Sequence, residues 1–85
     1  MATEPGSNLR VSEGTLLGES TISFDIRFRV ITITNDSGST EMTYKFNTTE
    51  TASTLKPSET ISLKIKSKDV ILSGSNVDYR IVAVA

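Results

Sequence analysis

The sequence offers few side chains that could carry catalysis. It contains no histidine and no cysteine, so a nucleophile activated by an imidazole base is excluded. A zinc or copper site would have to be built from oxygen ligands alone, which those metals rarely accept in proteins. No glycine-rich phosphate-binding motif is present. We therefore predict no enzymatic activity, no metal or other cofactor and no small-molecule substrate.

The other residue pairs that could act in catalysis, serine with lysine and acid with acid, are either solvated or too scattered to do so. Ser62 and Ser67 lie close in sequence to several lysines, but a lysine base must be desolvated before its pKa falls. These lysines share the solvated phase of their strand. Glycosidase chemistry needs two acids facing each other across a cleft. The acidic residues are instead scattered over predicted turns and solvated faces: Asp25, Glu41, Glu50, Glu59, Asp69 and Asp78.

The lysines form a stripe with three alternative uses: a solvated face, a partner-protein interface or a nucleic-acid contact. Arg27 and Arg29 could extend it toward an anionic surface. Single-stranded nucleic acid would need aromatic residues beside the cations, and Phe24 and Phe28 lie on the opposite, apolar phase. The net charge of −1 gives no general reason to bind nucleic acid or an acidic membrane. We predict neither partner. The stripe consists of Lys64, Lys66 and Lys68.

Two-residue alternation of apolar and polar side chains dominates the chain. The clearest run covers residues 22–30, and shorter runs cover 42–46, 61–66 and 77–81. This period is typical of strands with one buried and one solvated face. At Val30-Ile31 the phase slips by one, which a β-bulge or a bend between two sheets would absorb. The predicted core residues are Ile22, Phe24, Ile26, Phe28, Tyr44, Phe46, Ile61, Leu63 and Ile65.

Turn signals separate these runs. Small polar residues and glycine at 12–15, 35–39 and 73–76 predict turns, and Pro57 predicts a tight turn at a strand entrance. No segment has helical spacing. We expect an all-β protein, an antiparallel β-sandwich of six to seven short strands, immunoglobulin-like or jelly-roll-like. Residues 9–85 would form the single domain, preceded by a flexible N-terminal arm over residues 1–8.

The surface of the predicted domain is suited to contacts. Twelve serines and twelve threonines indicate a neutral, hydroxyl-rich β surface. Residues 81–85 are apolar on both phases, so this strand is either central in the fold or covered by another subunit. The candidate partner contacts are Leu9, Val11, Lys64, Lys66, Lys68, Ile81, Val82 and Val84.

Two sets of motifs resemble known families. Residues 31–35, followed by Leu55-Lys56-Pro57-Ser58-Glu59-Thr60, resemble the immunoglobulin-like modules of bacterial surface proteins, with serine replacing the usual glycine at Ser58. Residues 42–85 are similar to small tailed-phage virion proteins. The motifs that carry this second resemblance are Tyr44-Lys45-Phe46-Asn47, Thr54-Leu55-Lys56-Pro57-Ser58-Glu59, Val70-Ile71-Leu72-Ser73-Gly74-Ser75 and Val77-Asp78-Tyr79-Arg80-Ile81-Val82-Ala83.

The phage resemblance implies a structural component of a capsid, neck or tail, assembled as symmetric copies. We accordingly predict a virion structural or decoration protein that acts as a homo-oligomer, docks on other virion proteins, or both. It would assemble in the host cytoplasm, because the sequence has neither a signal peptide nor a transmembrane segment. The rivals are an immunoglobulin-like adhesion or accessory module of a larger surface protein, a sugar-binding module and an enzyme.

Overall fold

The computed structural model describes residues 9–85, which form four strands and no helix. All strand pairs are antiparallel, so the predicted all-β antiparallel class is confirmed. The arm predicted over residues 1–8 lies outside the described residues. No helix long and apolar enough to cross a membrane occurs within residues 9–85. The strands are β1 (Leu9–Asn35), β2 (Met42–Lys45), β3 (Ser53–Leu55) and β4 (Thr60–Val84), in the sheet order β1-β4-β2-β3.

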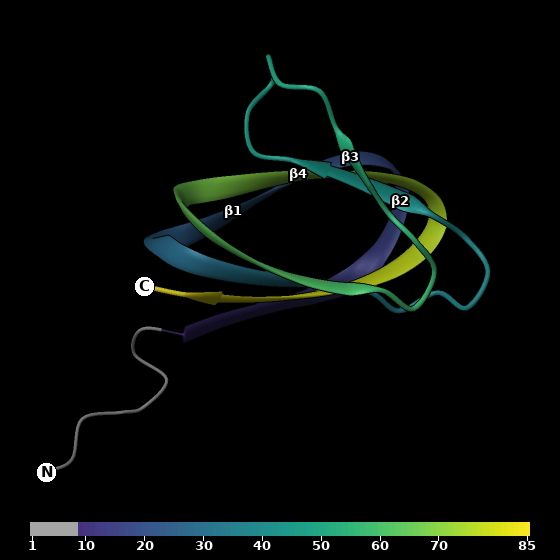
Figure 1. Ribbon diagram of the computed structural model, residues 1–85, viewed down its shortest axis with the longest axis horizontal. Helices are drawn as coiled ribbons and strands as arrows, with labels where there is room; N and C mark the ends of the chain where they lie inside the picture. Colours follow the sequence, from purple (N-terminus) through teal and green to yellow (C-terminus); the bar gives the residue numbers. More distant parts are fainter. Residues whose placement is uncertain (1–8) are drawn as a thin grey trace, which may run out of the picture.

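β1 and β4 are long, bent strands that each contribute to two layers. In the first layer the paired segments follow the order 9–14, 79–84, 30–35, 60–64. In the second layer, residues 17–23 pair with residues 69–75, and β2 and β3 continue the sheet beyond them. Figure 1 shows the ribbons of β1 and β4 curving around a ring, with β2 and β3 along one side. The two layers are therefore joined by strands that cross from one to the other.

The crossings lie where the register between β1 and β4 changes. At the first, Leu16 pairs with Val77 but Leu17 pairs with Ser75, which leaves Asn76 as an extra residue with φ 59°. Asparagine tolerates this left-handed conformation better than most residues. A bulge of this kind bends a strand without ending it. The turns predicted at 12–15 and 73–76 are therefore wrong, because both segments remain inside long strands.

The second crossing accounts for the phase slip at Val30. Phe28 pairs with Ser67, whereas Val30 pairs with Lys64, so two residues of β1 are matched by three of β4. The slip predicted from the sequence is thus an irregularity in a strand that turns from the second layer into the first. The bend keeps Phe28 buried and also keeps Ile31 buried, although the two residues lie on opposite phases of a straight strand.

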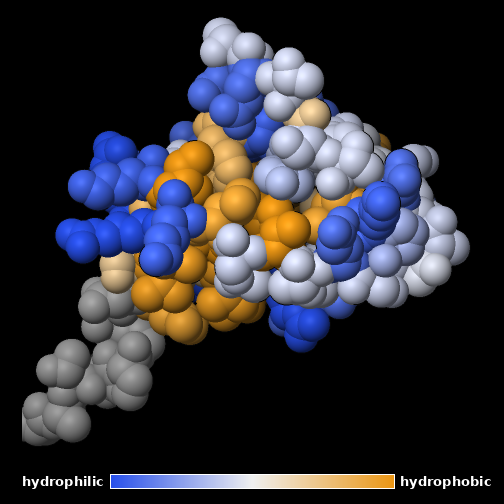
Figure 2. All heavy atoms as spheres, viewed as in Figure 1, coloured by the Kyte–Doolittle hydropathy of each residue, from blue (hydrophilic) through white to orange (hydrophobic). Residues whose placement is uncertain are grey.

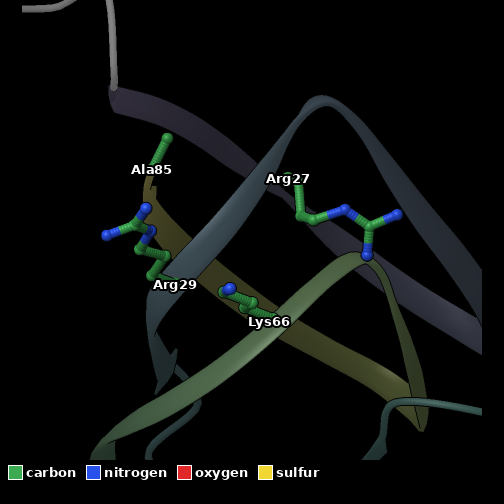
Figure 3. Close-up of a pocket in the computed structure, with 4 residues that line it drawn as sticks. All are labelled: Arg27, Arg29, Lys66 and Ala85. Atoms are coloured by element: carbon green, nitrogen blue, oxygen red, sulfur yellow. The ribbon is translucent and has the colours of Figure 1, made fainter.

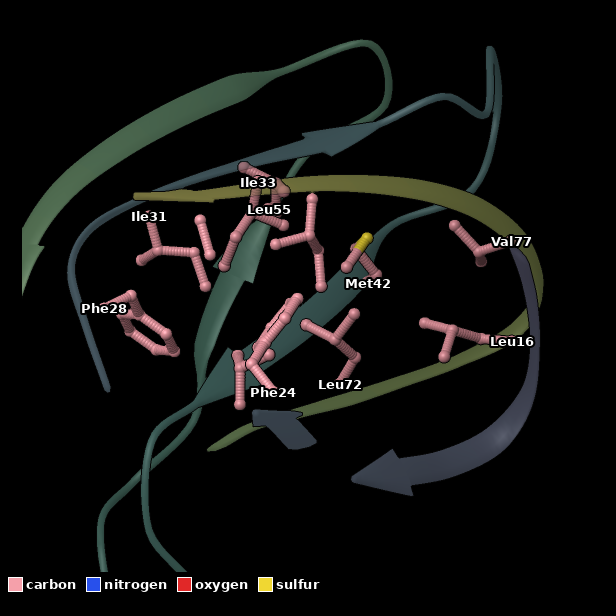
Figure 4. Packing of buried hydrophobic residues seen from close by; sticks show 12 residues of the cluster. Leu16, Phe24, Phe28, Ile31, Ile33, Met42, Leu55, Leu72 and Val77 are labelled. Carbon is pink, nitrogen blue, oxygen red and sulfur yellow. The ribbon is translucent and has the colours of Figure 1, made fainter. Parts of the chain in front are cut away.

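The core fills the space between the two layers. Phe24 and Phe28 are buried as predicted, with ring centroids 5.8 Å apart in an edge-to-face arrangement. The other predicted core residues are partly buried and pack against the central cluster. That cluster, most of which is labelled in Figure 4, consists of Leu16, Phe24, Phe28, Ile31, Ile33, Met42, Leu55, Val70, Leu72, Val77, Ile81 and Ala83.

Asn35 is a buried polar residue at the end of β1 with every side-chain group bonded. Its Nδ2 donates to the carbonyl oxygens of Thr40 and Leu55 at 2.8 and 3.1 Å. Its Oδ1 accepts from the backbone N–H of Ser37 at 2.9 Å. These bonds connect the end of β1, the loop that follows it and the end of β3.

Candidate functional site

An open hollow of about 480 Å³ lies where the second crossing meets the end of β4. Arg27 and Arg29 line it from β1, Lys66 lines it from the first part of β4, and Ala85 follows the last residue of β4. Figure 3 shows the amine of Lys66 extending toward Arg29, while the Arg27 guanidinium points to the other side. The volume lies in the range of about 300–1,000 Å³ that small-molecule sites occupy.

The alternating pattern of the strands explains why these cations point outward. Arg27 and Arg29 flank the buried Phe28, so burial of that ring directs both guanidinium groups away from the core. Lys66 precedes Ser67, the register partner of Phe28. The end of β4 reaches the same place because Val84 pairs with Val30. The irregular crossing therefore gathers residues from three separate stretches of sequence.

The charged side chains that line the hollow are all positive. Arg27, Arg29 and Lys66 are exposed, and none of them forms an ion pair within residues 9–85. An anion that entered would meet hydrogen-bond donors and no carboxylate among the lining side chains. Guanidinium groups bind carboxylate and phosphate in a bidentate manner, and an ammonium adds a mobile point charge.

The acidic residue in the same stretch of β1 is occupied elsewhere. Arg10 Nε donates to Asp25 Oδ1 at 2.7 Å. This hydrogen bond, with smaller coulombic contributions from Arg10 and Lys68, lowers the pKa of the Asp25 carboxyl below its usual 3.8. Asp25 is therefore ionised at neutral pH and bound to Arg10, and it leaves the cations of the hollow uncompensated.

The described residues contain no group of side chains suited to bind a metal ion. Within residues 9–85, no three acidic side chains gather closely enough to hold a metal ion. The space between the layers is filled by apolar side chains. The hollow is thus an outer, cationic feature, lined by two guanidinium groups, one amine and the methyl group of Ala85.

The predicted contact residues fall into three groups. Lys66 lines the hollow, and Lys64 and Lys68 lie exposed on either side of it along β4. Leu9 and Val11 are 41% and 52% exposed, and Val82 and Val84 are half-buried. Ile81 is fully buried in the core, so its prediction as a surface contact is wrong. The segment 79–84 has strands on both sides, which makes it central in the first layer.

Sequence reasoning treated Arg27 and Arg29 only as a possible extension of the lysine stripe. The signal that could have placed them was the phase slip directly after Arg29. A phase slip indicates a bend in the strand. Because Arg27 and Arg29 flank a buried ring at this bend, their side chains must lie on its outer side. Nothing in the sequence indicates that Ala85 lies beside them.

Solved structures similar to this fold include transcriptional regulators and a cupin superfamily protein. An HTH_3-family transcriptional regulator from Vibrio cholerae has a TM-score of 0.69 and 16% identity; the match covers 100% of this chain and 47% of that one. A cupin superfamily protein from Desulfitobacterium hafniense has a TM-score of 0.61 and 14% identity, covering 99% and 72% of the two chains. The Cupin_2 domain of an XRE-family transcriptional regulator from Enterobacter cloacae has a TM-score of 0.58 and 12% identity, covering 93% and 98%.

The chain therefore spans about half the length of the Vibrio regulator. No family model and no curated protein matches the sequence. The similarity to phage virion proteins, with the virion function and location that it implied, is wrong, because the structural neighbours are cupin proteins and transcriptional regulators. The resemblance to immunoglobulin-like modules is wrong for the same reason.

Proposed function

We propose that this chain is a regulatory module that binds a small anionic molecule in the hollow lined by Arg27, Arg29 and Lys66. The observation that carries the proposal is the meeting of three cations, none of them in an ion pair within residues 9–85, at an open hollow of about 480 Å³. Cupin domains of transcriptional regulators are among the structural neighbours, which supports a regulatory role.

The chemistry of the hollow favours a ligand with a phosphate or carboxylate group. The Arg29 guanidinium can take two oxygens of such a group, and the Lys66 amine that extends toward it can neutralise a further charge, while Arg27 lines the other side of the hollow. Because all three cations are exposed, salt screens the attraction, and affinity falls as ionic strength rises. The lining side chains are three cations and a methyl group, which supports binding without turnover, and the absence of catalysis stays a prediction.

The test is a titration of the full chain with inorganic phosphate, followed by backbone amide NMR. We expect saturable shifts confined to residues 27–29, 64–68 and 84–85. Replacing Arg29 and Lys66 together with glutamine should weaken binding by about tenfold or more, which corresponds to a loss of about 1.4 kcal/mol.

The matched control removes the same charge elsewhere. Lys45→Gln with Lys56→Gln lowers the net charge equally but leaves the hollow intact, so phosphate affinity should stay within about twofold. Equal loss in both double variants, or shifts produced equally well by chloride, would mean that only general charge attraction operates. Either result would refute the proposed site.

A further inference from the structure

The outward face of the first layer presents three registered rows. The first row contains Leu9, Val84 and Val30, and the second contains Val11, Val82 and Thr32. Toward the other edge, the first row continues to Lys64 and the second to Ser62, whose Oγ lies 2.8 Å from Thr32 Oγ1. Figure 2 shows hydrophobic surface on the side of the molecule where the chain ends, bordered by hydrophilic side chains. Within residues 9–85, Leu9 and Val11 are exposed and the other four residues of these rows are half-buried.

The third row carries opposite charges. Glu13 pairs in register with Arg80, and both side chains are exposed. Glu13 has no ion pair within residues 9–85, while Arg80 makes one weak contact to Asp36 at 3.4 Å. Segments 9–14 and 79–84 thus present three outward register pairs, and the two members of each pair attract one another: Leu9 with Val84, Val11 with Val82, and Glu13 with Arg80.

We infer that this face binds a second copy of the same chain. Two copies can stack these faces about a two-fold axis parallel to the strands and between segments 9–14 and 79–84. Each residue of one segment then lies over its register partner in the other copy. Leu9 meets Val84, Val11 meets Val82, and Glu13 meets Arg80, each contact occurring twice as a two-fold interface requires. Aligned packing of this kind is one of the two ordinary ways in which sheets stack.

The size of the face sets the expected strength. Two strands about 4.8 Å apart and three rows about 6.8 Å apart give an overlap of roughly 200 Å² per copy. Stable interfaces bury about 800 Å² on each partner. The dimer should therefore be weak and form reversibly as the concentration rises. This inference is independent of the proposed anion site, because none of the three rows lines the hollow.

The first test is sedimentation equilibrium of the full chain from micromolar to millimolar concentration. We expect a monomer–dimer equilibrium that Val11→Lys or Val82→Lys shifts to monomer. Leu17→Lys is the matched control, because Leu17 is 85% exposed but lies outside the three rows. It should leave the dimer constant unchanged. A monomer at every concentration, or a dimer that responds only to Leu17→Lys, would overturn the inference.

The second test separates the interface from the fold. In a dimer of Glu13→Arg, the new arginine of each copy would face Arg80 of the other, so both contacts would join two positive charges. In a dimer of Arg80→Glu, both contacts would join two negative charges. Each variant alone should therefore be monomeric. Mixed in equal amounts, they should form a heterodimer, because each contact then joins opposite charges. Circular dichroism verifies that both variants are folded. If the folded variants fail to combine, Glu13 and Arg80 do not face each other, and the proposed axis is wrong.

Discussion

At the scale of one residue, the buried side-chain amide of Asn35 is expected to stabilise the fold where β1 ends and the following loop begins. We expect Asn35→Ala to lower the free energy of unfolding by about 3 kcal/mol, because an unsatisfied buried polar group costs about 1–3 kcal/mol. The change would leave the Thr40 and Leu55 carbonyls and the Ser37 N–H without their side-chain partner. Urea denaturation followed by circular dichroism measures the loss.

Asn47 provides a control of the same residue type in the same local motif. Its Oδ1 also accepts from the N–H two residues later, that of Thr49, at 3.0 Å, but Asn47 is exposed. Water replaces its partners, so Asn47→Ala should cost less than about 1 kcal/mol. If the two variants lose equal stability, burial of the Asn35 amide is not the source of its effect.

Residue types indicated the chemistry of the hollow better than its location. The sequence alone showed that histidine and cysteine chemistry is absent and that Arg27, Arg29 and Lys66 lie on solvated phases. It did not place Ala85 beside them, because that contact depends on a pairing between Val30 and Val84, far apart in the chain. It also assigned Ile81 to the surface, since apolar residues on both phases do not reveal which phase faces the core.

At the scale of elements, the turn between β3 and β4 contains a residue in an unfavourable conformation. Glu59 N donates to Lys56 O at 3.0 Å, and Ser58 has φ 63°. This position of a type II turn is normally glycine. Ser58→Gly should raise the free energy of unfolding by about 0.5 kcal/mol, since the left-handed conformation costs a non-glycine residue about 1–2 kcal/mol and glycine loses about 0.5–1 kcal/mol more in chain entropy.

Ser53→Gly shows the entropy cost alone. Ser53 begins β3, is exposed and has a negative φ, so glycine there should destabilise the protein by about 0.5–1 kcal/mol. Both variants are compared by thermal melting under identical conditions. A fall in stability for Ser58→Gly would mean that the weak bond from Ser58 Oγ to Ser37 O, at 3.4 Å, outweighs the relief of the backbone.

The elements show where local signals are reliable. Alternation identified the strand phases, and Pro57 identified a real turn. Glycine and serine at 12–15 and 73–76 were misleading, because a bulge and a turn use the same residues. Six to seven short strands were expected where residues 9–85 form two long bent strands and two short ones. A bend that keeps its hydrogen bonds leaves no distinct local signature.

At the scale of the whole molecule, alternation shows which side chains face inward but not which strands are neighbours. Segment 9–14 pairs with 79–84, and segment 30–35 pairs with both 60–64 and 79–84. Several sandwich folds satisfy the same alternation with other pairings. Resemblance based on short turn motifs therefore indicated the wrong families, although the all-β antiparallel class was correct.

The shared strands also predict that the two layers unfold together. β1 and β4 cross between the layers, and the core cluster draws residues from both, so neither layer keeps its partners if the other opens. The slowest amide hydrogens in 30–35 and in 69–75 should exchange with the same free energy, measured by native-state hydrogen exchange. Ile33→Val, a change in the first layer, should lower both values equally by about 1 kcal/mol. A smaller fall in 69–75 would mean that the bends act as hinges between layers that open separately.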